Sequence, residues 1–376
     1  MAITRITTAN AIPDSSVNNV KISNIVQSKN IIINGDMSIA QRATSVTGLT
    51  NGSGGYHTCD RWRFTENGSP SFQFTQSQST DVPTGQGFAT SLKMDVTTAD
   101  TSLAAADALK IEQRIEGQNL QYLKKGTSSA ESTTISFWVK SAKTGIYISE
   151  LFDNDNSRQI SQSYTISNAN TWEKKTLTYA GDTSGAFGND NESSLSLNLW
   201  LGAGSNYSSG TLSTTWTSST NANRAVGQVN LSDSTSNDWY VTGIQLEAGT
   251  SASEFEFLPV DVNLQRCLRY CYVITGATDQ AIAIGDNANG SGAALFFLPL
   301  LTEMRSAPSG TFTTASHFEK LKYETGWADL SSIALSGTQP FLYVIEGGSS
   351  QSDTRGVGTA LRINNSSGKI TLSSEL

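Results

Sequence analysis

The sequence predicts an all-β protein whose main body is a jelly-roll β-sandwich. Charged residues make up only 15% of the 376 residues and hydrophobic residues 37%, while Ser, Thr, Asn and Gly fill much of the remainder. Short runs alternate polar residues with β-branched or aromatic ones, as in strands with one buried face and one wet face. Connections rich in Gly, Ser, Asn and Asp separate these runs, which favours a sandwich or jelly roll over an α/β fold.

The run SLSLNLWL at 194–201 shows the alternation most clearly, because it places four leucines on one face. In a jelly-roll domain spanning 30–258 we expect strands at Ser71–Ser77, Ser91–Val96, Thr133–Lys140, Gly145–Phe152, Trp172–Tyr179, Leu195–Leu201 and Asp238–Glu247. In a smaller C-terminal β domain spanning 273–376 we expect strands at Gln280–Gly285, Ala293–Leu301, Phe341–Gly347, Ala360–Asn364 and Lys369–Leu372.

Three further stretches contain sequence patterns that predict their local structure. Asp100–Ile115 contains an Ala cluster that favours a turn or two of helix before a strand. Val260–Tyr272 spaces its apolar residues near the helical period and follows Pro259, so residues 259–272 are predicted to form a helical connector. Asn30–Arg42 combines a β-branched run, an Asn-Gly turn signal and a second apolar run, which predicts a hairpin.

Residues 1–29 differ from the rest of the chain. They space Ile and Val widely among polar residues and contain no aromatic residue, so they bury too little surface to hold a fold of their own. We therefore expect an extended arm that is held by a sister subunit or a docking partner. A short strand folded back on its own domain is the alternative.

The charge and the cysteine content of the chain limit which partners and metal sites the sequence predicts. A net charge of -8 disfavours a nucleic-acid partner, because phosphate binding needs clustered Lys and Arg. Three cysteines are too few for a disulfide framework, and the two histidines lie far from Cys267 and Cys271, so we expect packing thiols and no metal site. The chain has neither an apolar run near ~20 residues nor a signal-peptide pattern, and we expect a protein made in the cytoplasm without membrane insertion.

Several motifs in order along the chain resemble those of phage tail fibre and virion appendage proteins. The resemblance covers about residues 30 to 310, together with the similar final segment ITLSSEL at 370–376. The motifs are NIIINGD at 30–36, QR at 41–42, DRW at 60–62, TISFWVKS at 134–141, WEKKT at 172–176, TGIQLEAG at 242–249, EFEFLP at 254–259, CLRYC at 267–271 and MRSAP at 304–308. The family's long repetitive shaft is missing from this chain, which leaves its place on the particle open.

This resemblance implies a jelly roll of carbohydrate-binding-module type, a smaller β head and a homotrimer. We expect the protein to bind a host surface glycan through its polar, aromatic-bearing loops. The resemblance also implies that residues 1–29 attach the protein to other virion tail proteins, through the apolar residues Ile3, Ile6, Ile12, Val17, Val20, Ile22 and Ile25. A short tail fibre located in the virion is the leading hypothesis. A capsid or baseplate decoration, or an adaptor that binds only virion partners, is the alternative.

Catalysis is not predicted, although some phage appendages cleave host glycans and a depolymerase is a second alternative. Glycoside hydrolysis needs two carboxyl groups about 5–10 Å apart. Asp153 with Asp155, and Asp190 with Glu192, have the spacing of one strand face, but turn formation explains such residues in Asn- and Gly-rich loops. The same oxygen ligands would suit a structural Ca²⁺, although the chain has no Asp-x-Asp-x-Asp-Gly loop. We expect no cofactor.

Aromatic side chains in polar loops are the candidates for glycan contact, because aromatic rings stack on sugar faces. The candidates are Tyr207, Trp216, Tyr323 and Trp327. Packing in the core or at a subunit interface remains the alternative for Trp216 and Trp327. The strand settings of the other five tryptophans predict core positions for Trp62, Trp138, Trp172, Trp200 and Trp239.

Overall fold

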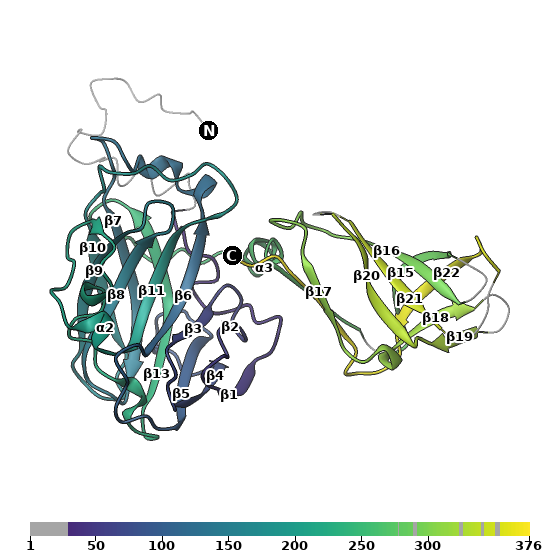
Figure 1. Cartoon of the computed structure of the whole chain (residues 1–376), viewed down its shortest axis with the longest axis horizontal. Helices are drawn as coiled ribbons and strands as arrows, with labels where there is room; N and C mark the ends of the chain where they lie inside the picture. The colour runs from purple at the N-terminus through teal and green to yellow at the C-terminus, as the bar shows by residue number, and fades with distance from the viewer. Residues whose placement is uncertain (1–28, 277, 289–291, 323–325, 340–341, 350–353) are drawn as a thin grey trace, which may run out of the picture.

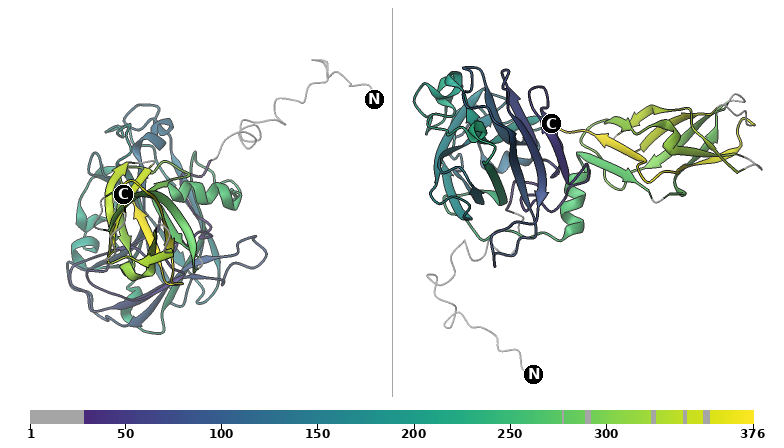
Figure 2. Two further views of the ribbon diagram at one scale, coloured as in Figure 1. Left: turned by 90° about the vertical axis from the view of Figure 1, so that its right-hand side faces the viewer. Right: turned by 90° about the horizontal axis from the view of Figure 1, so that it is seen from below.

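The computed structural model describes residues 29–276, 278–288, 292–322, 326–339, 342–349 and 354–376. Two bodies lie side by side and are joined at a short helix (Figures 1 and 2). The larger body is a sandwich of two antiparallel sheets. One sheet has the order β1 (Ser45–Leu49), β4 (Gln73–Ser79), β5 (Ser91–Thr98), β13 (Asp238–Ala248), β7 (Thr133–Ser141) and β10 (Glu173–Tyr179).

The second sheet of the sandwich contains seven strands. Their order is β12 (Thr217–Ser218), β9 (Arg158–Ile166), β8 (Gly145–Asp153), β11 (Ser193–Ala203), β6 (Ala108–Glu116), β3 (Arg63–Asn67) and β2 (Gly55–Tyr56). All strand pairings in the two sheets are antiparallel. The predicted all-β jelly-roll class is confirmed, and every strand expected in this part of the chain is present.

The core lies between the two sheets and follows the predicted alternation. Leu195, Leu197, Leu199 and Leu201 of β11 are all at most 1% exposed. Residues of β11 on the opposite face are also buried, because the segment after the strand folds back over the sheet. Trp200 packs there with Ala225 and Tyr207 of that segment in a second apolar cluster.

The tryptophan positions divide into two groups. Trp62, Trp200 and Trp239 are fully buried, as predicted. Trp138 and Trp172 are only half-buried, so the core position predicted for them is wrong. Trp138 pairs across β7 and β13 with Thr242, and its neighbours Phe137 and Val139 point into the core, which leaves its own side chain on the outer face.

Residues 30–42 form no strand, so the predicted hairpin is wrong. The turn at Gly35 is present, but side chains rather than a strand ladder hold its flanks. Asn34 has a positive φ of 57° and bonds through its amide to both backbone groups of Ile39. Gly35 lies so close to β13 that an added Cβ would be 2.1 Å from the carbonyl oxygen of Ile244, which requires glycine at this position.

The helix predicted near residue 100 is also absent. Residues 100–107 contain only a turn and bends before β6 begins at Ala108. Asp107 stabilises this turn, because its carboxylate accepts hydrogen bonds from the backbone amides of Ala104 and Ser69. Asp and Asn side chains that bond to nearby backbone groups favour such turns over helix.

A helix does form where the connector was predicted. Helix α3 (Val260–Leu268) follows Pro259 and ends shortly before the first strand of the smaller body, β14 (Cys271–Thr275). The final residues of the chain return to this junction, where the carboxylate of Glu375 pairs with Arg61 and Arg42. The hydroxyl of Tyr56 donates to the carbonyl oxygen of Leu376 at 3.0 Å.

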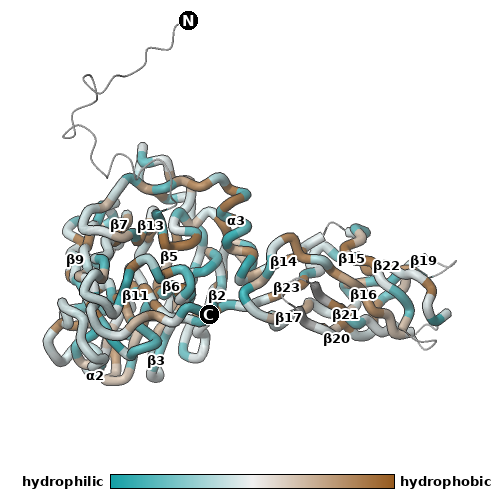
Figure 3. Tube along the Cα trace, turned by 90° about the horizontal axis from the view of Figure 1, so that it is seen from above, coloured by the Kyte–Doolittle hydropathy of each residue, from teal (hydrophilic) through white to brown (hydrophobic). Residues whose placement is uncertain are grey.

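The smaller body contains two further antiparallel sheets. A three-stranded sheet has the order β14, β23 (Lys369–Ser373) and β17 (Ser309–Phe312). A seven-stranded sheet has the order β19 (Gly326–Asp329), β18 (Phe318–Lys322), β22 (Gly358–Ile363), β15 (Gln280–Asn287), β16 (Ala293–Pro299), β21 (Leu342–Gly348) and β20 (Ser332–Gln339). All five strands expected here are present. Hydrophobic and hydrophilic residues are interspersed along both bodies (Figure 3).

Among the described residues, we find no helix that is long and apolar enough to cross a membrane.

Candidate functional site

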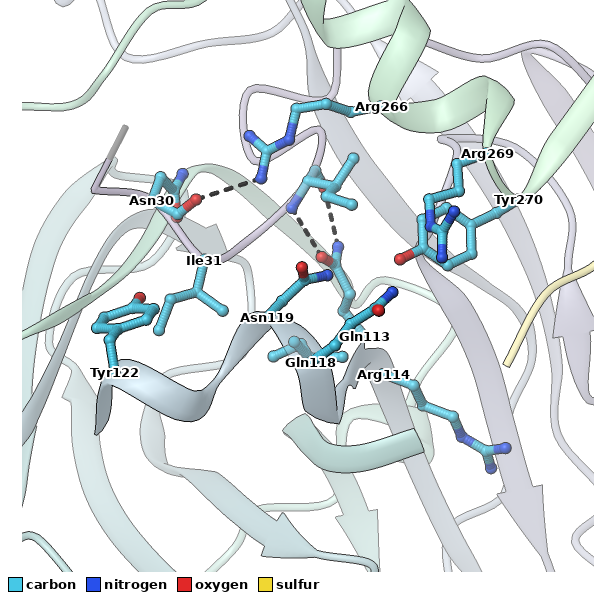
Figure 4. Close-up of a pocket in the computed structure, with 12 residues that line it drawn as sticks. Asn30, Ile31, Gln113, Arg114, Gln118, Asn119, Tyr122, Arg266, Arg269 and Tyr270 are labelled. Carbon is cyan, nitrogen blue, oxygen red and sulfur yellow. Dashed lines mark hydrogen bonds between the residues drawn. The ribbon is translucent and has the colours of Figure 1, made fainter. Parts of the chain in front are cut away.

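A pocket of about 400 Å³ lies at the seam between the sandwich and α3 (Figure 4). Four segments that are far apart in sequence form it: the stretch before the Gly35 turn, strand β6, the short helices η3 (Gly117–Asn119) and η4 (Gln121–Leu123), and the region of α3. We call it the seam pocket. Its lining residues are Asn30, Ile31, Ile33, Gln113, Arg114, Ile115, Gln118, Asn119, Tyr122, Arg266, Arg269 and Tyr270.

Two amide side chains fix the walls of the seam pocket. The Gln113 amide donates to the carbonyl oxygen of Ile33 at 2.9 Å and accepts from its N–H at 2.8 Å, which imitates a rung of a β-ladder. Asn30 donates to the carbonyl oxygen of Ile244 and accepts from the N–H groups of Ile32 and Leu246. Both side chains therefore have a structural role: they hold residues 30–33, which form one wall of the pocket, against β6 and β13.

Two of the three arginines in the pocket are neutralised by carboxylates. Arg269 donates two hydrogen bonds of 2.8 Å to the buried carboxylate of Glu116, which raises the pKa of Arg269. Arg114 donates to Glu112 at 3.2 Å. In Figure 4 the side chain of Arg114 also points away from the group formed by the other labelled residues.

Arg266 differs from both. Within the part of the chain that the structure describes, its guanidinium makes one hydrogen bond, to the carbonyl oxygen of Asn30 at 3.3 Å, and no ion pair. Burial lowers the pKa of Arg266, and the carboxylate of Glu256, which raises that pKa, does not offset the burial. The positive charge is therefore partly desolvated without a direct counter-charge.

Two neutral polar groups in the pocket are also unengaged. Neither the amide of Asn119 nor the hydroxyl of Tyr122 has a hydrogen-bond partner among the described residues, and both side chains are exposed. Half of the Tyr122 side chain is exposed, but partial desolvation of the hydroxyl raises the pKa of Tyr122 to about 12, so this hydroxyl is protonated at neutral pH and can donate. Asn119 and Tyr122 rise from one side of the pocket and Arg266 enters from α3 on the other, and the side chain of Ile31 lies beside Tyr122 (Figure 4).

A second group of aromatic residues lies on the outer face of the six-stranded sheet. Trp172 packs edge-on against Tyr240, with ring centroids 6.1 Å apart, and the ammonium group of Lys140 lies 4.1 Å from the centroid of Tyr240. The indole N–H of Trp172 donates to Asp81 at 3.0 Å, and Asp81 also pairs with Lys140. The polar groups of this cluster thus satisfy one another, unlike Arg266, Asn119 and Tyr122 in the seam pocket.

The aromatic residues predicted to contact a glycan do not come together. Tyr207 packs on Trp200 over the seven-stranded sheet. Trp216 donates its indole N–H to the carbonyl oxygen of Ala180 and covers the buried ammonium group of Lys125 at 5.3 Å. Trp327 lies in the smaller body under the guanidinium of Arg362, at 4.2 Å. Tyr323 and the attachment residues between Ile3 and Ile25 lie outside the described residues.

The carboxylates singled out in the sequence do not form facing pairs. Asp153 is fully buried and pairs with Lys125, whereas Asp155 is exposed in the following turn and accepts from the N–H of Gly188. Asp190 accepts from the N–H of Glu192, as a turn-forming residue does. Lys125 also pairs with Asp182 at 3.1 Å, so Lys125, Asp153 and Asp182 form a buried ion cluster inside the sandwich.

The three cysteines are buried free thiols. Burial raises the pKa of all three, to about 12 for Cys271. Among the described residues, no cluster of His, Cys, Asp and Glu is suited to hold a metal ion.

Apart from Tyr122, the unengaged residues of the seam pocket escaped prediction because no local sequence pattern identifies them. Arg266 lies in a stretch that the sequence identified only as a connector, and Asn119 and Tyr122 lie between two strands. Their proximity depends on α3 packing beside the end of β6, and no local periodicity encodes that contact. Tyr122 offered one usable signal, an aromatic residue in a polar Gln- and Asn-rich loop.

Comparison with known proteins finds no matching family model and no matching curated protein. Among solved structures, the enzymatically active domain of bacteriophage CBA120 tailspike protein 4 is similar at 14% identity and a TM-score of 0.32, over 58% of this chain and 21% of that chain. A family 61 carbohydrate-binding module in complex with β-1,4-galactotriose is similar at 9% identity and a TM-score of 0.28, over 59% of this chain and 99% of that chain. A family 11 carbohydrate-binding module of Clostridium thermocellum is similar at 11% identity and a TM-score of 0.28, over 55% of this chain and 95% of that chain.

Proposed function

We propose that this protein binds a glycan in the seam pocket without chemically changing it. The observation that carries the proposal is the set of unengaged polar groups there, Arg266, Asn119 and Tyr122, beside an apolar wall formed by Ile31. Sugars are recognised by an aromatic or apolar surface for the ring and by a few fixed polar groups for the hydroxyls. The pocket offers both, on walls that Gln113 and other buried amides hold in place.

Glycan-array screening of the purified chain, followed by calorimetry on the glycans it binds, tests this proposal. We expect Tyr122→Ala to weaken binding about 3- to 10-fold, because one aromatic contact contributes roughly 0.5–1.5 kcal/mol. Tyr207→Ala is the matched control, since Tyr207 packs on the seven-stranded sheet away from the pocket. Loss of binding on Tyr207→Ala with full binding by Tyr122→Ala would move the site to the sheet.

We further propose that the protein is a phage tail fibre that carries this site to the host surface and joins the tail through residues 1–29. The ordered series of motifs between residues 30 and 310 supports this assignment. The test is deletion of residues 1–28 in phage particles. We expect the truncated chain to fold and to bind the glycan but to be missing from purified particles. Normal incorporation would reject the attachment role of the arm.

We also propose that the chain forms a homotrimer, and an apolar face on the smaller body supports self-association. Ile284 is 73% exposed and pairs across β15 and β16 with Phe297, which is 41% exposed. We take this exposed apolar pair as the centre of the contact between copies. Light scattering should give three times the chain mass, and the double substitution Ile284→Lys and Phe297→Lys should give the single mass. Val262→Lys, at another exposed apolar residue, is the control.

An adaptor that binds only other virion proteins is the alternative, and the same experiments separate the two. The adaptor role predicts incorporation through residues 1–28 together with no glycan bound on the array.

A further inference from the structure

We infer that the seam pocket takes an acidic glycan and that Arg266 receives the carboxylate of a uronate or similar acidic sugar. This inference rests on the proposed glycan function and specifies its ligand class. It starts from the donors of Arg266. A guanidinium carries five N–H donors in a fixed planar fork. Only one bond of this group is present within the described residues, to the carbonyl oxygen of Asn30.

The other cations around the pocket are accounted for. Arg269 is neutralised by Glu116 and Arg114 by Glu112. Arg266 also lies close to the face where Tyr122 and Asn119 present unengaged donors. Burying a cation without a counter-charge is unfavourable, and a bound anion removes that penalty. The pocket therefore has the charge balance of a site completed by one negative group.

The geometry of the donor favours a carboxylate. The planar fork of arginine matches a carboxylate with two parallel hydrogen bonds. The two neutral donors beside it, Asn119 and Tyr122, suit sugar hydroxyls. General attraction of anions does not explain the site, because the chain as a whole carries a net charge of -8. A negative ligand must instead be recognised locally, at Arg266.

The test is an array of bacterial surface glycans on which each acidic glycan is printed beside a copy with its carboxyl groups reduced to alcohols. We expect wild-type protein to bind acidic glycans and to lose about 10- to 100-fold in affinity for the reduced copies. Arg266→Gln should lose a similar factor on the acidic glycans and should no longer distinguish the two copies. Lys174→Gln is the control, because Lys174 is an exposed cation on β10, away from the pocket. Thermal unfolding verifies that Arg266→Gln is folded.

The outcomes separate the two proposals. Equal binding of wild-type protein to acidic and reduced copies overturns the acidic-sugar inference and leaves the glycan function standing, and this comparison needs no variant. Discrimination that survives in Arg266→Gln overturns the assignment of the carboxylate to Arg266. Binding restricted to phosphorylated or sulfated glycans also overturns the carboxylate assignment. The absence of any bound glycan on the array overturns the proposed function and this inference with it.

Discussion

Replacing Glu375 with Gln should loosen the junction between the two bodies. The carboxylate of Glu375 is 7% exposed and pairs with Arg61, which is 1% exposed, and with Arg42 at 3.1 Å. Arg61 lies over the ring of Tyr270 at 3.5 Å and also donates to the carbonyl oxygen of Arg114. The substitution keeps the volume and one acceptor but leaves a buried guanidinium without its counter-charge.

Breaking a buried ion pair by removing one partner costs about 3–5 kcal/mol. We expect a loss of about 3 kcal/mol, at the low end, because Gln still accepts a hydrogen bond and Arg61 keeps its bond to Arg114. With a urea m-value of about 2–3 kcal/mol/M, the unfolding midpoint should fall by roughly 1–1.5 M. Tryptophan fluorescence measures this unfolding midpoint. Trp327 is the only tryptophan after residue 270, so a Trp327→Phe background isolates the unfolding of the larger body.

Glu192→Gln is the matched control for the junction. Glu192 is 72% exposed and pairs with Arg305 across the junction at 3.4 Å. Exposed ion pairs contribute roughly 0–1 kcal/mol, so this variant should unfold almost like the wild type. If Glu375→Gln shifts the midpoint no more than Glu192→Gln does, the buried pair does not stabilise the junction and the reasoning is wrong.

Three further predictions concern the interior. Burial raises the pKa of Glu112, but the charges of Lys110, Arg114 and Arg63 lower it by more, so the pKa of Glu112 is about 2. The stabilisation from its charged form is therefore present above the unfolded pKa, near 4.5, and is lost as the pH falls towards 2, at most about 3 kcal/mol. Glu112→Gln should lack this pH slope in urea titrations, and an unchanged slope would contradict the assignment. Burial raises the pKa of Cys59, Cys267 and Cys271, so the native protein at pH 8 should resist labelling by iodoacetamide. In urea the same reagent should label all three thiols, and mass spectrometry measures the difference. Trp216→Ala should cost about 2 kcal/mol of stability by uncovering Lys125, and its glycan affinity should be unchanged. Weaker glycan binding by a fully folded variant would mean that Trp216 contacts the glycan after all.

The strands were predictable from sequence because their side chains are decided locally. In β11 the four leucines alternate with Ser196, Asn198 and Trp200, and the period of two predicts both the strand and the face that enters the core. The stretch after Asn30 failed the same kind of prediction. Ile31, Ile32 and Ile39 are buried, but Asn34 and Gly35 satisfy the backbone through side-chain bonds and a close approach to β13. Such contacts between distant segments leave no periodic trace.

The candidate site was harder to predict than the fold because it is made by docking. The sequence indicated aromatic residues in polar loops, and that rule selected Trp216, whose ring instead covers a buried lysine inside the sandwich. The same rule applied to residues 117–123 would have selected Tyr122. Nothing in the sequence distinguishes Arg266 from Arg269, three residues later. Only the structure reveals that Glu116 pairs with the second arginine and that the first has no carboxylate partner among the described residues.

The position of Arg266 on α3 also links binding to the junction. Arg269 and Tyr270, just after the helix, both bond to Glu116 on β6, and Tyr270 stacks on Arg61, whose charge Glu375 balances. Loosening that pair should let α3 shift against β6 and separate Arg266 from Asn119 and Tyr122. We therefore expect Glu375→Gln, which alters no residue of the pocket lining, to weaken binding of an acidic glycan several-fold in calorimetry, whereas Glu192→Gln should not. Equal affinities for the two variants would mean that the pocket is held by the sandwich alone, through Gln113 and Asn30, and that the junction serves stability without serving recognition.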